Sequence, residues 1–202
     1  DASNDGEQIP RWYLRSLKIM NPGGLLSAHG VWYPGEGGKT RLDTTATITD
    51  IGKVLSSLEY ANAMQGAPGT IKSGLSWVGS PLDFNTATLN GSITGELGQG
   101  KFLQIEPGAG RILSLLSLQH LLRRLTLDFR DVLGKGFAFD SVNLEGEITN
   151  GILTIPKSTV LGSAASVVSA GEINLPAETL NLRAVILPSI NAGGPSLALA
   201  LI

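Results

Sequence analysis

The chain of 202 residues contains no cysteine, which excludes disulfide bonds, thiolate metal ligands and cysteine nucleophiles. Charged residues are scarce, at 16% of the chain against about 25% in ordinary soluble domains. Lys and Arg together number 15, the net charge is −2 and no basic run occurs, so nucleic acid is not an expected partner. The sequence also lacks the run of about 18 uninterrupted apolar residues that a membrane-spanning helix needs.

Glycine and alternating apolar residues are what the sequence has in abundance. It contains 26 glycines and 42% hydrophobic residues, which indicates many short turns and a surface less polar than usual. From residue 40 to residue 48, small or apolar side chains alternate with polar ones, as in a strand with two different faces. Ile71, Leu75 and Trp77 likewise share one face of a strand expected over residues 69–78.

The whole pattern predicts a mainly β protein built as an antiparallel meander. Strands are expected over residues 12–20, 25–33, 40–48, 69–78, 82–89, 91–97, 101–105, 125–132, 138–148, 152–155, 158–161, 165–173 and 179–187. Gln99-Gly100 and Asn150-Gly151 occupy positions suited to tight hairpin turns. No alternation of strands with helices occurs, which argues against a parallel sheet.

Two helices interrupt this pattern. Apolar residues at helical spacing predict one strongly apolar helix at about 109–124, which closes on Arg123 and Arg124, where cations suit the helix end. This helix is expected to plug or cap the sheet. A shorter helix is expected at about 51–60, with Asp50 as its N-cap.

Catalytic chemistry is not visible in the sequence. His29 and His120 have no acidic residue or second histidine at ligand spacing, so no metal site is expected. No closely set pair of carboxylates supports a glycan hydrolase. We therefore expect no catalytic residue, no metal and no cofactor, and we do not interpret the chain as an enzyme.

Several short segments carry a family resemblance. They read PGAGR at 107–111, LTLDFRDV at 125–132, GFAFD at 136–140, NG at 150–151 and LPSINAG at 187–193. With them the chain, from about residue 12 to residue 202, resembles the AsmA-like C-terminal region of the YhdP family. Residues 1–11 are then expected to be the polar leader of a fragment, and residues 12–202 an AsmA-like C-terminal β-groove domain.

The resemblance implies a role in the envelope of Gram-negative bacteria. Proteins of this family are large, are anchored by an N-terminal helix in the inner membrane, and reach across the periplasm. They are implied in moving phospholipid towards the outer membrane through a long β-sheet groove. Phospholipid and components of the outer membrane or envelope are therefore the expected partners, and the periplasm is the expected location.

The apolar faces of the strands must be covered by something, and there are two interpretations of what covers them. The residues alone favour a closed sandwich core. The resemblance implies instead that the meander forms a curled sheet or open groove, a trough that holds acyl chains. In the second case the expected lipid-binding residues are Leu42, Ile48, Ile71, Leu75, Trp77, Leu125, Leu127 and Phe129. The alternative function is a structural end of a β-array that docks an envelope protein without binding lipid.

Overall fold

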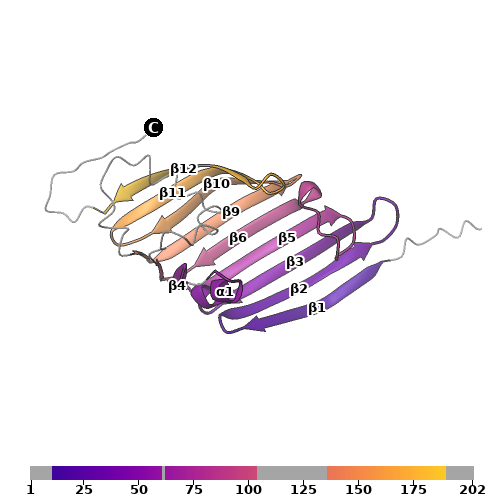
Figure 1. Ribbon diagram of the computed structural model, residues 1–202, viewed down its shortest axis with the longest axis horizontal. Helices are drawn as coiled ribbons and strands as arrows, with labels where there is room; N and C mark the ends of the chain where they lie inside the picture. The colour runs from indigo at the N-terminus through magenta and orange to yellow at the C-terminus, as the bar shows by residue number, and fades with distance from the viewer. Residues whose placement is uncertain (1–10, 61, 104–135, 190–202) are drawn as a thin grey trace, which may run out of the picture.

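A computed structural model describes residues 11–60, 62–103 and 136–189 of the chain. Its main feature is one open antiparallel sheet of nine strands, which follow one another in chain order across the sheet (Figure 1). The strands are β1 (Trp12–Asn21), β2 (Gly24–Tyr33), β3 (Lys39–Ile48), β5 (Gly69–Val78), β6 (Asn90–Leu97), β9 (Ser141–Thr149), β10 (Ile152–Leu161), β11 (Ala165–Asn174) and β12 (Thr179–Pro188). The predicted antiparallel meander is confirmed.

The turn between β9 and β10 shows how the sequence encodes this meander. Asn150 has φ 48° and Gly151 has φ 77°, so both central residues adopt the left-handed conformation that a two-residue hairpin favours. The hairpin expected at Gln99-Gly100 is not formed. There the chain leaves the large sheet after β6, and β7 (Gly100–Phe102) pairs instead in a second, three-stranded sheet with β4 (Met64–Gly66) and β8 (Phe137–Phe139).

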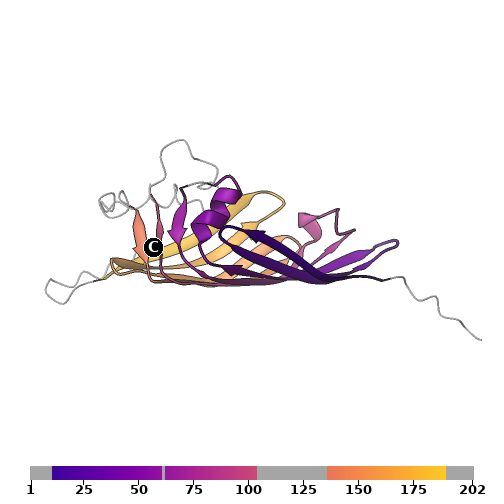
Figure 2. The same cartoon turned by 90° about the horizontal axis from the view of Figure 1, so that it is seen from below.

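The second sheet and helix α1 (Ile51–Ser57) both lie on one side of the large sheet, which curls towards them (Figure 2). The carboxylate of Asp50 caps α1 by accepting hydrogen bonds from the backbone N–H groups of Gly52, at 2.9 Å, and Lys53, at 3.3 Å. The predicted short helix is confirmed, but it ends at Ser57 and not near residue 60. It stops early because Glu59 adopts a positive φ of 69°, a conformation that ends helices.

Three strand predictions need correction. The single strand expected at 138–148 is divided near Asp140, so that β8 belongs to the second sheet and β9 to the large sheet. Residues 82–89 form a loop with the 3-10 helix η1 (Thr86–Thr88), because the Asn85 side chain accepts a hydrogen bond from the backbone of Ala87 at 3.0 Å. The two strands expected at 152–155 and 158–161 are a single strand, β10. Its register shifts between Ile155 and Ser158, around Pro156, which has no backbone N–H to donate to a neighbouring strand.

Other predictions fall on parts of the chain that the structure does not describe. The apolar helix at 109–124 and the strand at 125–132 lie outside the described residues. Of the strand expected at 101–105, the structure describes only the part up to residue 103, where β7 ends at Phe102.

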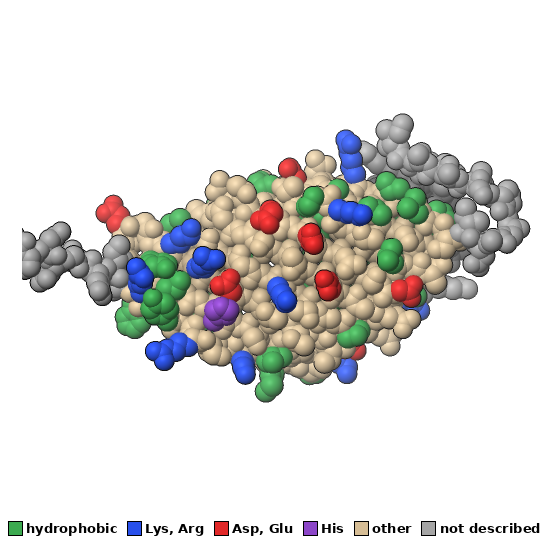
Figure 3. All heavy atoms as spheres, turned by 180° about the vertical axis from the view of Figure 1, so that it is seen from behind, with side chains coloured by type: hydrophobic (Ala, Val, Ile, Leu, Met, Phe, Trp, Pro, Cys, Tyr) green, Lys and Arg blue, Asp and Glu red, His purple; other side chains and the backbone are tan. Residues whose placement is uncertain are grey.

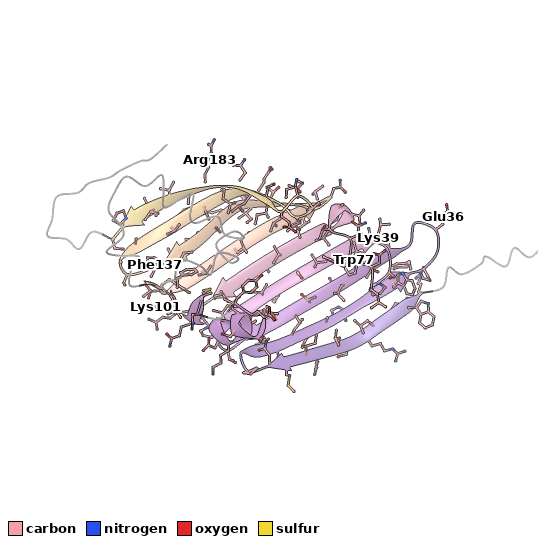
Figure 4. All side chains as sticks on the ribbon, viewed as in Figure 1. Glu36, Lys39, Trp77, Lys101, Phe137 and Arg183 are labelled. Carbon is pink, nitrogen blue, oxygen red and sulfur yellow. The ribbon has the colours of Figure 1, made fainter. Side chains whose placement is uncertain are left out.

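The hydrophobic core is divided between the two ends of the strands. One cluster joins the large sheet to α1 and the second sheet, and its buried members are Ile48, Ile51, Ala67, Phe137, Phe139 and Ala165. The other cluster, at the opposite strand ends, contains buried Trp77, Leu89 and Ile148. Figure 4 shows Trp77 and Phe137 at these opposite ends. The closed sandwich that the residues alone favoured is therefore not found among the described strands.

Candidate functional site: the inner face of the large sheet

We call the side of the large sheet that bears α1 and the second sheet its inner face. The strand register places every second residue of each strand on this face. Its principal residues are Trp12, Leu14, Leu17, Ile19, Leu26, Ala28, Trp32, Thr40, Leu42, Thr44, Ala46, Ile48, Ile71, Ser73, Leu75, Trp77, Ile93, Leu97, Val142, Leu144, Ile148, Leu153, Ile155, Ser158, Val160, Val167, Ser169, Ile173, Leu180, Leu182, Ala184 and Ile186. None of these residues is charged.

The opposite, outer face is polar. Figure 3 shows Lys, Arg, Asp and Glu side chains scattered over it, with hydrophobic side chains between them. In the described part of the chain, one histidine–carboxylate contact lies on this face: His29 Nε2 is 3.8 Å from Asp43 Oδ2, across two neighbouring strands. The pair is exposed, and in the described residues no third side chain that could ligate a metal lies beside it. It is therefore a surface contact and gives no reason to assign a metal or catalytic site.

The few hydroxyl groups on the inner face are already hydrogen-bonded. The hydroxyls of Thr44 and Ser73 lie 2.8 Å apart, and those of Ser158 and Ser169 also form a hydrogen bond. Thr40 is only 3% exposed and donates its hydroxyl to the Gly79 carbonyl at 2.8 Å. Because these hydroxyl groups already have hydrogen-bond partners within the protein, they present few unpaired polar atoms to an apolar ligand.

Small residues occupy the middle of the inner face, between the two core clusters. Register pairs place Thr44 beside Ser73, and Leu144 beside both Gly95 and Ser158. We call the middle of the face around Thr44, Ser73, Ile93, Gly95, Leu144 and Ser158 the central strip. Ile93 and Leu144 are large side chains of this strip, and each is half-buried. The centre of the face therefore carries mostly small, uncharged side chains that project little from the sheet, and its larger side chains stay partly accessible.

Structural elements rise from the inner face at both ends of the strands. At one end α1 and the second sheet pack on Ile48 and its neighbours, and at the other the loop from Gly79 to Leu89 folds over Trp77 (Figure 2). The Trp77 indole nitrogen donates to the Ser80 carbonyl at 3.0 Å, and its ring meets Phe84 edge-on with centroids 5.1 Å apart. These contacts hold the loop against Trp77, so that the loop borders the inner face at this end of the strands.

The expected lipid-binding residues have different surroundings in the structure. Leu42, Ile48, Ile71, Leu75 and Trp77 all lie on the inner face, as the alternation predicted. Ile48 and Trp77 are 5% and 4% exposed, so the end structures cover them, whereas the other members of this group are half-buried. The remaining expected residues, Leu125, Leu127 and Phe129, lie outside the described residues.

Ile93 and Leu144, in the central strip, were not among the expected site residues. Each lies in a segment that was expected to be a strand, but glycines at positions 91, 95 and 146 interrupt the apolar alternation there. The signal that could have found them is the repeat of Gly-Glu-aliphatic at residues 95–97 and 146–148, which aligns the two strands.

Neither a metal centre nor a membrane-crossing helix is found in the described part of the chain. No group of three or more His, Asp, Glu or Cys side chains in residues 11–60, 62–103 and 136–189 is arranged to hold a metal ion. Within the same residues, no helix combines the length and the apolar content that crossing a bilayer requires.

Comparison with known proteins identifies the family of this chain. The sequence profile of the family described as YhdP protein matches residues 4–202. The intermembrane phospholipid transporter YhdP of Escherichia coli (strain K12) is 40% identical over 119 residues, which cover 58% of this chain and 9% of that protein. The chain thus spans less than a tenth of the length of this relative, and no solved structure matches it. With the profile covering nearly all of its length, the chain belongs to the YhdP family.

Proposed function

We propose that this chain binds the acyl chains of phospholipids on the inner face of its large sheet and so forms part of a lipid-transport path. The observation that carries the proposal is the contrast between the two faces of one open sheet: the strands bear no charged residue on the inner face, whereas charged side chains are scattered over the outer face. The resemblance to a phospholipid transporter agrees with it. The role is stoichiometric and non-catalytic.

The proposal extends to a longer protein of which this chain would be one segment. That protein is proposed to be anchored in the inner membrane, to span the periplasm and to pass phospholipid towards the outer membrane. In this arrangement the inner face of the present sheet is one stretch of a longer apolar path. Its partners are then phospholipid and components of the outer membrane or envelope.

A second candidate function is the docking of an envelope protein without lipid. The observation that favours it is β1, an edge strand of the sheet among the described residues, whose apolar residues, among them Trp12 and Met20, are largely exposed. An unpaired edge strand can accept a further strand from another segment. This candidate predicts that the inner face stays empty while the edge is occupied.

Acyl-chain binding predicts a dependence on chain length. Each methylene removed from water contributes roughly 0.8 kcal/mol, which corresponds to about a fourfold change in affinity per buried CH₂. Because the inner-face strand positions carry no charge, exchanging one head group for another should change affinity much less. We therefore expect long-chain phospholipids to displace short-chain ones, whatever the head group.

Native mass spectrometry of the purified chain, followed by competition between phospholipids, measures both effects. The expected result is co-purified phospholipid at a fixed stoichiometry, with affinity ordered by chain length. A protein that retains its fold but carries no phospholipid, and takes up none when phospholipid is added, would favour the docking function. An affinity set mainly by the head group would contradict the apolar mode of binding.

A further inference from the structure

All three tryptophans of the chain lie in one row across the sheet. Trp12 on β1 pairs with Trp32 on β2, Trp32 pairs with Thr40 on β3, and Thr40 pairs with Trp77 on β5. These residues share the inner face, at the end of the strands where the loop from Gly79 to Leu89 rises. We call Trp12, Trp32 and Trp77 the tryptophan row.

The other end of the strands has a different chemistry. The cluster beneath α1 and the second sheet is built from aliphatic residues and phenylalanines, and Phe102 lies against Phe137 and Phe139 with ring centroids 6.4 and 5.0 Å apart. On the inner face of the described strands, every tryptophan lies in the row and no tyrosine occurs. Across β1 to β5 the face therefore changes from amphipathic aromatics at one end of the strands to apolar packing at the other.

This gradient matters because tryptophan prefers the boundary between apolar and wet surroundings. Its ring buries apolar surface while its indole N–H donates a hydrogen bond, which is why tryptophan gathers at the interfaces of membranes. The Trp77 indole already donates to the Ser80 carbonyl and its ring is buried. Trp32 is half-buried and Trp12 is 64% exposed, so these two are the members of the row that a bound molecule can reach.

We infer that Trp12 and Trp32 mark the position of the glycerol and ester groups of a bound phospholipid. The acyl chains then run along the strand direction, over the central strip, towards the end covered by α1. The head group lies beyond the tryptophan row, outside the charge-free face. This inference rests on the proposed function and adds to it the orientation of the lipid and two positioning residues.

Quenching of tryptophan fluorescence by brominated phospholipids tests the orientation. The probes are two phospholipids with the same head group, one brominated near the ester end of its chains and one near the methyl end. In the Trp12→Phe variant the accessible emitter is Trp32. The Trp12→Phe/Trp32→Phe variant leaves only buried Trp77 and supplies the background to subtract.

A matched control reports from the opposite end of the same strand. Ile19 lies on the inner face of β1 and is 52% exposed, so Ile19→Trp in the double-variant background places an emitter there without disturbing a packed core. We expect Trp32 to lose more fluorescence to bromine near the ester end. The Ile19→Trp variant should lose more to bromine near the methyl end.

The outcomes separate the orientation from the proposed function. Lipid retained in native mass spectrometry with the reverse order of quenching, with equal quenching, or with none at Trp32 would overturn the orientation and leave lipid binding intact. A folded chain that takes up neither probe lipid would overturn both. The order given above supports both.

Discussion

Replacing Phe139 by alanine should lower the free energy of unfolding by about 3–5 kcal/mol, the range for large-to-small changes at buried phenylalanines. Phe139 is 1% exposed and is the largest fully buried side chain in the described structure. Its ring packs on Phe102 and lies over Gly100, where an added Cβ would come within 2.7 Å of it. The cavity left by alanine would open between the second sheet and the large sheet. Urea unfolding followed by circular dichroism measures the loss.

Two further variants serve as a control and as a fallback for this prediction. Lys101→Ala changes an exposed residue of the same small sheet and should unfold within about 0.5 kcal/mol of the wild type. If Phe139→Ala fails to fold at all, Phe139→Leu should fold with a loss of about 1–2 kcal/mol, because leucine fills most of the cavity. A Phe139→Ala protein as stable as Lys101→Ala would show that the second sheet is not packed on the large one.

Replacing Ile93 by lysine should weaken phospholipid binding by roughly 30- to 1,000-fold. Ile93 is a half-buried residue of the central strip, so its side chain would face the acyl chains. A lysine facing hydrocarbon costs about 2–4 kcal/mol on a lipid-facing β-strand, and each 1.4 kcal/mol is a factor of ten. Binding of a fluorescent long-chain phospholipid, measured by titration, gives the change in affinity.

Thr94→Lys is the matched control for this variant. Thr94 is the next residue along β6, lies on the outer face and is exposed, so the same charge meets water there. We expect it to bind phospholipid as the wild type does. Equal affinity of the two variants, with similar unfolding midpoints, would exclude the central strip from lipid binding.

Local patterns predicted most of the large sheet. Residues 40–48 and 69–78 alternate cleanly, and the structure has β3 and β5 there with Leu42 and Leu75 as register partners on one face. Asp50 and the apolar stripe after it predicted α1, and Asn150-Gly151 predicted its hairpin. These features depend on neighbours within a few residues, and such signals can be found in a single sequence.

Features that depend on distant residues escaped prediction. The second sheet joins three strands of three residues each from separate parts of the chain, and each is too short to show a period. Residues 82–89 look like a strand because Leu82, Phe84 and Leu89 are apolar, yet the turn-forming Asn85 and the anchoring of the loop by Trp77 override that pattern. Whether the sheet closes is a global property that no local pattern encodes.

The same reasoning explains what could be foreseen of the candidate site. Alternation correctly grouped Leu42, Ile71 and Leu75 on one face, because side chains on a strand point to opposite faces in turn. It did not separate them from Ile48 and Trp77, which α1 and the loop after β5 cover. Covering of this kind depends on where distant segments fold back, so only the structure distinguishes the accessible residues from the covered ones.

Site-specific photo-crosslinking tests most directly whether the inner face holds acyl chains. A photo-reactive amino acid replaces Leu75 on the inner face in one variant and Asp43 on the outer face in another, both in the full-length protein in cells. Because the two positions lie on neighbouring strands of the same sheet, they differ mainly in the face they present. Phospholipid crosslinked at position 75 and not at position 43 is the expected result. Equal crosslinking at the two positions, or none at position 75 in a folded protein, would contradict lipid binding by the inner face.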